Sequence, residues 1–379
     1  MVNYEPIKLY IWLMNYNWQQ KDWPNFQYEE DKIGVTPLGF GLASGQMEGI
    51  LIGLPDEKKN EAIIDLLVSE AIKTSEIEGE FLSRQDVRSS VIKTLGLEQE
   101  PKQVRDQRAK GIAKLMVTIR KNYKQPLSEA VLFQWHKLVM SGNKKLVAGQ
   151  WRSHSSPMQI VSGAVGKEKV HFEAPPSASV PKEMQGFINW FNETAPGQPK
   201  AMSNAMVRSA LAHLYFESIH PFEDGNGRIG RAISEKALSQ GLGQPIILSL
   251  SSAIEKKREA YYKALKNAQR SNEVTKWVVY FAITVVEAQK EAKKVIDFSL
   301  LKAKFFDVHT GMNKRQTKVI NRMFQEGPNG YEGGMNAKKY MSITKTSKAT
   351  ATRDLQALSD AGIFNLIGAG RSVRYELKW

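Results

Sequence analysis

The segment from His220 to Arg231 places several side chains that could act on a phosphate group within one turn and the start of a helix. His220 is a candidate general base, because an imidazole titrates near neutral pH and can take a proton from a hydroxyl group. Asp224 offers a hard oxygen ligand for Mg²⁺, which proteins commonly hold with one carboxylate plus the phosphates of a substrate. Arg228 and Arg231 lie about one helical turn apart and offer two guanidinium groups to phosphate oxygens. Together these residues predict attack by a hydroxyl group on a nucleotide phosphate.

Two helices are expected to position these side chains. Apolar residues between Ala205 and Ile219 recur at helical spacing and predict a buried helix that Pro221 ends. A residue before proline is pushed out of the helical region, so we expect His220 to be extended. The glycine-rich loop that follows can turn tightly, and the free N–H groups of the next helix would then form an anion site in the same turn. Any two of these residues would suit an ordinary His-Pro turn before a helix, so the prediction depends on the whole set.

The same segment resembles the signature of the Fic family, His-Pro-Phe-x-Asp/Glu-Gly-Asn-Gly/Lys-Arg-x-x-Arg, and departs from it at no fixed position. The resemblance implies a mainly α fold: a Fic-type helical bundle core with a β-hairpin flap. It also implies an enzyme that transfers AMP from ATP to a Ser, Thr or Tyr hydroxyl and releases pyrophosphate, with Mg²⁺ as cofactor. The hydroxyl would belong to a target protein or to the chain itself. In this family His220 would be the base and Asp224 the metal ligand. The residues that would hold the phosphates are Gly225, Asn226, Gly227, Arg228 and, for the γ-phosphate, Arg231.

Segments on both sides of the signature also resemble the family. The run Leu127–Met140 is similar to its first core helix, and Gly149–Arg152 to its approach to the flap. The flap, which holds the target by main-chain pairing, is predicted as strands at 158–161 and 169–172 joined across Ser162 and Gly163. Its target-binding residues would be Gln159, Ile160 and Val161.

Two aromatic residues beyond the signature are candidates for the adenine pocket. Tyr261 and Tyr262 follow the signature at the place where aromatic residues line this pocket in Fic relatives. Ordinary core packing is an equally good interpretation of both. Helices are predicted here over 254–268 and 273–295.

A second motif predicts that the enzyme is restrained. Between Glu61 and Glu80 the apolar stripe of a helix, extended in steps of three and four from Leu67, reaches Thr74 and then Glu78. Glu78 is therefore expected to face inward and Glu80 to face the opposite side. A buried carboxylate needs a partner, and Arg231 is the candidate.

The segment Thr74–Gly79 resembles the Fic inhibitory motif Ser/Thr-x-x-x-Glu-Gly/Asn. In that family the glutamate pairs with the last arginine of the signature and blocks the seat of the γ-phosphate. The resemblance thus implies autoinhibition by an N-terminal helix through Thr74, Glu78 and Gly79. The alternative is an amphipathic helix whose last glutamate reaches solvent.

The last part of the chain has the order of a winged helix-turn-helix. Helices are predicted over 315–325, 336–342 and 349–361, followed by strands over 363–367 and 372–377. Thr352 and Arg353 would lie on the recognition helix and Arg371 at the tip of the wing. From Leu300 onward there are 14 Lys and Arg against 6 Asp and Glu, so eight of the chain's net +14 charges fall here. This surplus favours DNA as a partner, although many winged helices mediate only protein contacts such as homodimerisation.

Composition limits the remaining possibilities. The chain has 379 residues and no cysteine, which excludes a thiolate nucleophile, disulfides and cysteine-ligated zinc, and is compatible with the cytoplasm. The histidines are scattered, and no apolar run approaches the ~18 residues of a membrane span, so no membrane association is expected. We expect three parts: an aromatic-rich N-terminal extension with the inhibitory helix (1–125), a catalytic core (126–299) and a winged-helix domain (300–379).

Other functions remain open on this sequence. The chain could be a DNA-binding regulator that uses its core as a nucleotide sensor, although a sensor has no need of a base such as His220. The same site could also transfer another nucleotide moiety or remove AMP by hydrolysis.

Overall fold

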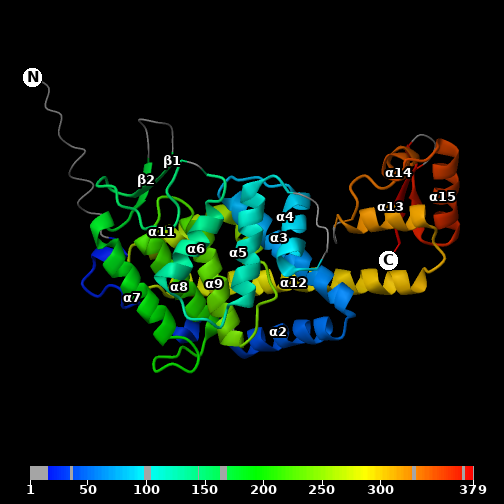
Figure 1. Cartoon of the computed structure of the whole chain (residues 1–379). Helices are drawn as coiled ribbons and strands as arrows, with labels where there is room; N and C mark the ends of the chain where they lie inside the picture. The colour runs from blue at the N-terminus through cyan, green and yellow to red at the C-terminus, as the bar shows by residue number, and fades with distance from the viewer. Residues whose placement is uncertain are drawn as a thin grey trace, which may run out of the picture. The chain divides into compact units, whose positions relative to one another are not determined.

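A computed structural model describes residues 16–34, 37–97, 104–143, 145–162, 169–326, 330–368 and 372–378 of the chain. The described part is mainly helical and has two separate two-stranded sheets, so the predicted mainly α fold is confirmed (Figure 1). It divides into two compact units, residues up to 48 with 63–291, and residues 49–62 with 292 onward. Helices α2 (Pro37–Ile52), α3 (Asp56–Ile77) and α12 (Thr275–Val308) each contribute to both units.

The first unit is a bundle of helices with one hairpin. Its other helices are α4 (Arg84–Leu95), α5 (Gln107–Lys121), α6 (Glu129–Val139), α7 (Val180–Glu193), α8 (Ala205–Ile219), α9 (Asn226–Leu242), α10 (Leu250–Lys256) and α11 (Arg258–Ala268). Short 3-10 turns lie at Asn17–Gln19, Glu30–Lys32 and Ser177–Ser179.

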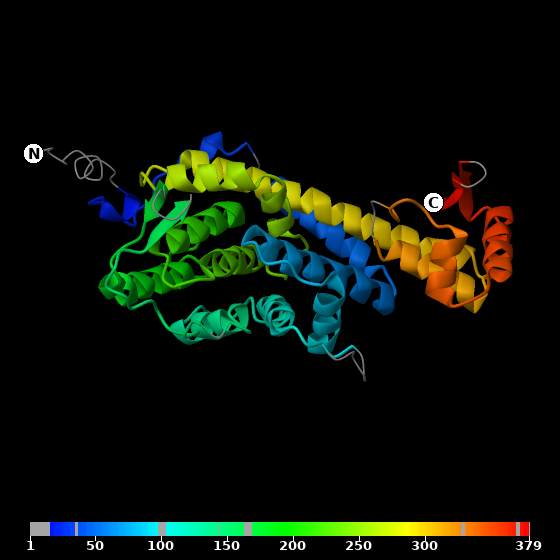
Figure 2. The same cartoon turned by 90° about the horizontal axis from the view of Figure 1, so that it is seen from above.

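Helices α8 and α9 form the centre of this unit. They pack along each other, α7 packs on α8, and α5 and α6 pack on α9 (Figures 1 and 2). Every residue of α8 is buried, and the side chain of Asn204 caps its first N–H groups. The loop between α8 and α9 carries the signature, so the helices that form the core also fix the site.

The hairpin consists of β1 (Gln159–Ser162) and β2 (Lys169–Glu173), paired antiparallel, as the flap prediction requires. The predicted turn at Gly163 lies outside the described residues. Phe172 anchors the hairpin by an edge-to-face contact with Tyr16, and Trp18 Nε1 donates to the carbonyl oxygen of Glu173 at 2.8 Å. Tyr16 and Trp18 therefore support the hairpin, whereas Trp23 and Phe26 pack against Tyr215 of α8.

The second unit contains the end of α12 followed by α13 (Lys314–Phe324), α14 (Ala337–Thr344), α15 (Lys348–Asp360), β3 (Phe364–Ile367) and β4 (Arg374–Leu377). Asp354 joins its three short helices: the carboxylate accepts from Arg315 Nε and Tyr340 Oη, both at 2.8 Å. The order of elements is the predicted one, while the assignment to the winged-helix class stays a prediction. Arg371, expected at the wing tip, lies outside the described residues.

Two predicted helices differ from the structure. The single helix expected over 254–268 is wrong, because the chain breaks at Lys257 between α10 and α11, where Lys257 N donates to Ile254 O at 3.0 Å. Helix α12 runs past the expected end at residue 295 to Val308, across the predicted boundary at 299. That domain boundary stays a prediction. Among the described helices, none is both long enough and apolar enough to cross a membrane.

Candidate active site

His220 ends helix α8 in a left-handed conformation, with φ 50° and ψ 61°. The extended conformation predicted for it is wrong. Pro221 does exclude the right-handed helical region, but in the left-handed region His220 N still donates to Phe216 O at 2.9 Å. Arg152, which is buried, donates from Nε to His220 O at 2.8 Å. A left-handed non-glycine residue costs about 1–3 kcal/mol, and these two bonds hold it in place.

The ring of His220 faces a buried carboxylate. Glu217 lies one turn earlier on α8, and its Oε2 is 3.5 Å from His220 Nδ1. Burial raises the pKa of Glu217, but His220, His213 and Arg231 lower it by more, so its pKa lies below the usual value and the group stays ionised. A carboxylate at Nδ1 leaves Nε2 of His220 as the nitrogen that can accept a proton from a substrate.

A side chain of the loop after His220 holds the loop in shape by hydrogen bonds to its main chain. Asn226, which is buried, accepts from Phe222 N at 2.9 Å and donates to Phe222 O at 2.8 Å. Its side chain therefore fixes the loop, and only its main chain is free to hold a phosphate. Gly225 has φ 82°, and a β-carbon there would lie 2.9 Å from Val139 Cγ1, so this position needs glycine. The first N–H groups of α9 have no side-chain cap and open into the turn, as predicted.

His136 supports the loop from helix α6. Its Nδ1 accepts from Gly149 N at 2.9 Å, which leaves Nε2 to donate to Asp224 O at 3.2 Å. Burial lowers the pKa of His136 to about 4, so the ring is neutral at physiological pH. The ring also stacks on Phe222, with 4.0 Å between centroids.

Asp224 presents its carboxylate to the same turn. The side chain is 52% exposed, and its cationic neighbour is Arg228, with Nη2 3.8 Å away. A half-exposed carboxylate beside an open helix N-terminus fits a Mg²⁺ ion that takes its other ligands from water and phosphate. No group of three or more acidic or histidine ligands occurs among the described residues, so the protein alone would supply few of the ligands.

Arg231 is buried on α9 and is held by the end of α3. Its Nε donates to Thr74 Oγ1 at 2.8 Å, and its Nη2 donates to Thr74 O at 2.9 Å and to Glu78 Oε1 at 2.8 Å. Burial alone would lower the pKa of Arg231, but Glu78 raises it above its usual value. The structure pairs Glu78 with Arg231, as predicted, but leaves the Glu78 side chain less buried than predicted.

Glu78 does not lie on the buried stripe of a helix. Helix α3 ends at Ile77, and Gly79 turns the chain with φ 79°, so that Glu80 N donates to Ser75 O at 2.9 Å. The side chain of Glu78 is 29% exposed. Glu78 still follows Thr74 by one helical turn, because Glu78 N donates to Ser75 O at 3.1 Å, so both side chains reach Arg231.

The Glu78 carboxylate also lies against the start of α9. A β-carbon on Gly227 would lie 2.3 Å from Glu78 Oε1 and 3.1 Å from Arg231 Nη1. Gly227 is therefore the residue that lets an anionic group approach the helix N-terminus closely. In this structure the approaching anion is Glu78.

Arg228 does not face the same way as Arg231. The Arg228 side chain is 3% exposed. Its Nη1 lies 2.9 Å from Glu80 Oε2, and its Nη2 donates to Met140 Sδ. The prediction that Glu80 faces away from the signature is wrong, because the turn at Gly79 reverses its direction. Arg228 is also absent from the lining of the pocket described next.

A pocket of about 670 Å³ connects the signature to the hairpin and to α11. Its size suits a nucleotide. The predicted residues that line it are His220, Asp224, Gly225, Asn226, Gly227, Arg231, Tyr261, Tyr262, Glu78, Ile160 and Val161. Of the other predicted residues, Thr74 reaches the site through Arg231, and Gln159 points to Glu173 Oε2 at 2.7 Å.

The two tyrosines take different positions in this pocket. Tyr261 is buried and shares a hydrogen bond of 2.6 Å between its hydroxyl group and His213 Nε2, whereas Tyr262 is 40% exposed. Burial raises the pKa of both. Tyr262 is the one of the pair whose ring is open to a ligand.

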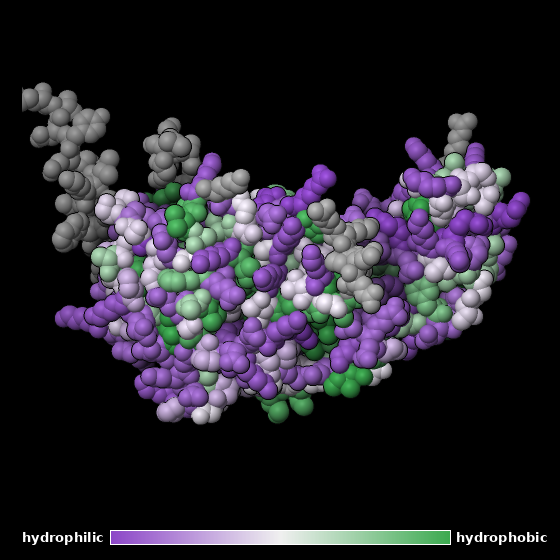
Figure 3. Space-filling model, viewed as in Figure 1, coloured by the Kyte–Doolittle hydropathy of each residue, from purple (hydrophilic) through white to green (hydrophobic). Residues whose placement is uncertain are grey.

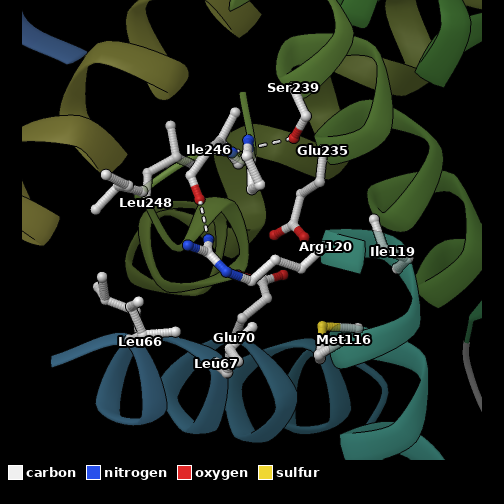
Figure 4. A pocket seen from close by; sticks show the side chains of 13 residues that line it. Leu66, Leu67, Glu70, Met116, Ile119, Arg120, Glu235, Ser239, Ile246 and Leu248 are labelled. Carbon is white, nitrogen blue, oxygen red and sulfur yellow. Dashed lines mark hydrogen bonds between the residues drawn. The ribbon is translucent and has the colours of Figure 1, made fainter. Parts of the chain in front are cut away.

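Helix α3 is joined to α9 a second time, one turn beyond Arg231. Glu235 of α9 and Glu70 of α3 point towards each other beside Arg120 in a small cavity of about 30 Å³ (Figure 4). Glu70 accepts from Ser249 Oγ at 2.8 Å and from Ser251 N at 2.9 Å. Burial and the neighbouring Glu70 raise the pKa of Glu235 well above its usual value. This environment favours the protonated form of Glu235.

Sequence reasoning missed several residues of this arrangement. Glu217 could have been found from its position one turn before His220 on the same helix. Nothing in the sequence marked Arg152 except its position in Gly149–Arg152, which resembles the Fic approach to the flap. Glu70, Glu80 and Glu235 were also missed, because their partners lie far away in the sequence.

Two family models match the chain. The Fic/DOC family model covers residues 126–238, and a model described as a domain of unknown function (DUF4172) covers residues 16–97. The first match contains the hairpin, α8 and most of α9, and the second contains α2 and α3.

Curated relatives match the same central region. A probable protein adenylyltransferase from Aquifex aeolicus is 30% identical over 128 residues, which are 34% of this chain and 32% of the relative. The protein adenylyltransferase Fic of Nematostella vectensis is 26% identical over 141 residues, 37% of this chain and 28% of the relative. The chain thus spans about a third of the length of these two enzymes.

A shorter relative and one solved structure extend the comparison. A Fido domain-containing protein from Dictyostelium discoideum is 30% identical over 140 residues, 36% of this chain and 92% of the relative. The crystal structure of a Fic family protein from Desulfovibrio desulfuricans has a TM-score of 0.51 at 19% identity and covers 94% of this chain and 98% of that one, which shows a shared fold. With the signature on the loop between α8 and α9, these matches establish that the chain belongs to the Fic family.

Proposed function

We propose that this protein is an autoinhibited protein adenylyltransferase that moves AMP from ATP to a Ser, Thr or Tyr hydroxyl of a target protein, which can be the chain itself. One observation carries the proposal: a single pocket brings together His220, Asp224, Arg231 and the uncapped N-terminus of α9. The names of the adenylyltransferase relatives support the same reaction.

The chemistry follows from the positions of these groups. His220 Nε2 takes the proton of the target hydroxyl, whose oxygen forms a bond to the α-phosphorus of ATP. The bond from that phosphorus to the bridging oxygen breaks, and pyrophosphate leaves. Once Glu78 has left Arg231, the charge that develops on the phosphate oxygens would meet the N–H groups of α9 and Arg231. When bound, Mg²⁺ would be held by Asp224 and would neutralise phosphate charge.

The target would bind along the hairpin. Strands β1 and β2 pair only with each other among the described residues, so an extended segment could join the hairpin along β1. Val161 is 46% exposed and lines the same pocket as His220, which supports docking of the target here.

The restraint would come from Glu78. One guanidinium cannot bind a carboxylate and a γ-phosphate in the same geometry, and Glu78 already binds Arg231 Nη2 at 2.8 Å. Glu78 also occupies the space beside Gly227 where a phosphate would approach.

The test uses the full chain and Glu78→Gly, each incubated with Mg²⁺ and ATP labelled on the α-phosphate. We expect Glu78→Gly to raise labelling of protein hydroxyls, in cell lysate or on itself, on the order of tenfold or more. An unchanged or lower rate in a folded Glu78→Gly protein would contradict the inhibitory role. Parallel reactions with labelled GTP, CTP and UTP, and with a pre-adenylylated target, separate this activity from other nucleotide transfer and from AMP removal.

A second candidate function belongs to the C-terminal unit. We propose that α15 contacts DNA, because Thr352 and Arg353 are exposed on it and the segment from Leu300 carries a surplus of eight positive charges. The face of α13 to α15 seen in Figure 3 is mostly hydrophilic, as such a contact requires.

A further inference from the structure

We propose that Glu80 is a second inhibitory residue, which holds Arg228 as Glu78 holds Arg231, so that the turn after α3 restrains both signature arginines at once. The inference rests on the proposed function and extends it to the regulation of the same site.

The two contacts come from one turn and reach one helix. Glu78 and Glu80 flank Gly79: Glu78 ends the last turn of α3, and the Gly79 φ of 79° turns the chain so that Glu80 also faces α9. Glu78 Oε1 lies 2.8 Å from Arg231 Nη2, and Glu80 Oε2 lies 2.9 Å from Arg228 Nη1. The two arginines lie one helical turn apart on α9, so the spacing of the carboxylates matches the spacing of the cations.

Both ion pairs are sheltered on the arginine side. The side chains of Arg231 and Arg228 are 1% and 3% exposed, whereas those of Glu78 and Glu80 are 29% and 30% exposed. Solvent therefore screens these pairs less than it screens surface pairs. The carboxylates lie on the more exposed side, so they can leave while the arginines stay in place.

Arg228 has a reason to accept a new anion. Its Nε has no hydrogen-bond partner among the described residues, and its second carboxylate, Asp224, is 3.8 Å away. Arg228 does not line the pocket while Glu80 holds it, so its unused donor could turn to a phosphate oxygen only after that carboxylate has left. Glu80 therefore competes with the phosphate for Arg228.

The consequence is that releasing Glu78 alone leaves the turn docked. With Glu78 replaced by glycine, Glu80 would still hold Arg228 and keep the end of α3 over the N-terminus of α9. Full access for ATP would require both carboxylates to move, and their effects on ATP binding would then be more than additive.

The experiment compares the full-length parent, Glu78→Gly, Glu80→Gln and the double variant. Binding of Mg²⁺-ATP is measured by calorimetry and AMP transfer with α-labelled ATP. Glu80→Gln is expected to raise ATP affinity about fivefold in the Glu78→Gly background, and transfer with it. Glu76→Gln is the matched control, because Glu76 lies on the same helix and pairs with Lys73 at 2.5 Å, away from the signature. It should change neither quantity.

If Glu80 instead helps Arg228 to bind ATP, its removal should not raise ATP affinity. If Glu80 only neutralised Arg228, Glu80→Gln would leave ATP affinity unchanged or lower it in both backgrounds, and this result would overturn the inference. Should Glu80→Gln fail to fold, Gly79→Ala replaces it: its β-carbon meets no atom within 4 Å, so it only strains the left-handed turn. Made in the Glu78→Gly background, Gly79→Ala should then raise ATP affinity over Glu78→Gly alone, and no rise would equally overturn the inference.

The two readouts separate this inference from the proposed function. A rise in ATP affinity without transfer in any variant would keep the double restraint and reject the transferase. If Glu78→Gly transfers AMP and Glu80→Gln does not increase that transfer, the transferase is kept and the double restraint is rejected. If no variant binds ATP, both proposals fail.

Discussion

His220 combines a strained main chain with a side chain fixed by one carboxylate. Arg152 holds its carbonyl oxygen at 2.8 Å, and Glu217 faces its Nδ1 at 3.5 Å. Neither contact involves the residues beyond Pro221 that would surround a phosphate. The position of the imidazole is therefore set before a substrate arrives, which is what a general base requires.

At the scale of this residue, His220→Ala is expected to lower transfer by about 10²–10⁴-fold, since that is the usual contribution of a positioned base. The change is made in the Glu78→Gly background, where activity is measurable. ATP affinity should change little, because Arg231 and the N-terminus of α9 remain.

Labelling rates and calorimetry check this prediction. His154→Ala is the control, since His154 lies in the loop before the hairpin and is not one of the residues that line the pocket. A His220→Ala protein that transfers AMP as fast as its parent would remove the base assignment.

Helix α3 meets α9 at two levels, and the two levels differ in chemistry. At its end, Glu78 pairs with a cation, whereas two turns earlier Glu70 meets another carboxyl group on Glu235 (Figure 4). The charged groups that face Glu235 are Glu70, Arg120 and Arg231. Together the carboxyl pair and the ion pair determine how firmly the inhibitory helix lies on the signature helix.

At the scale of this element, Glu235→Gln is expected to make stability less dependent on pH. The folded-state pKa of Glu235 is raised, so its stabilising contribution is complete below the unfolded value of about 4.3 and is lost as pH rises through the folded value. Each unit of the shift corresponds to about 1.4 kcal/mol. Glutamine can still donate to Glu70 without ionising, so the variant should be more stable than the parent above neutral pH.

Denaturant unfolding at pH 5 and pH 8 measures this difference. Glu193→Gln is the control, because that side chain is 48% exposed and pairs with Lys200 on the surface. Equal pH dependence of parent and Glu235→Gln would show that Glu235 is ionised in the folded protein.

The whole molecule carries its charge unevenly. Eight of its net +14 charges fall from Leu300 onward, in the segment that contains the end of α12 and the elements α13 to β4. Several of these cations are already used within the unit, as Arg315 is by Asp354. Arg353 is exposed on α15 next to Thr352, and this makes it the residue with which to test DNA contact.

At this scale, Arg353→Ala in the full chain is expected to weaken binding to duplex DNA and to reduce the slope of log affinity against log salt by about 1. Fluorescence anisotropy between low and physiological salt measures both quantities. Lys200→Ala, at a 72% exposed position of the first unit, should leave the slope unchanged. Binding that shows no dependence on salt, or on Arg353, would reject DNA as the partner of this unit.

The sequence by itself determined the local features of this protein. The His220–Arg231 segment, the end of α8 at Pro221 and the start of α9 in the glycine-rich loop all follow from residue types within one or two turns of chain. Such features depend on backbone sterics and nearby hydrogen bonds, which spacing records. The order of elements after α12 was predictable for the same reason.

Only the tertiary structure decided which groups face one another. The left-handed state of His220 depends on Arg152 from a distant loop, and the direction of Glu80 on a single left-handed glycine. The pairing of Glu70 with Glu235 depends on how α3 packs on α9. Side chains far apart in the sequence meet when helices pack, and the free energy that brings them together comes from burying the apolar faces around them. The periodicity of one helix shows which face is buried, but it does not specify which residues of another helix that face will meet.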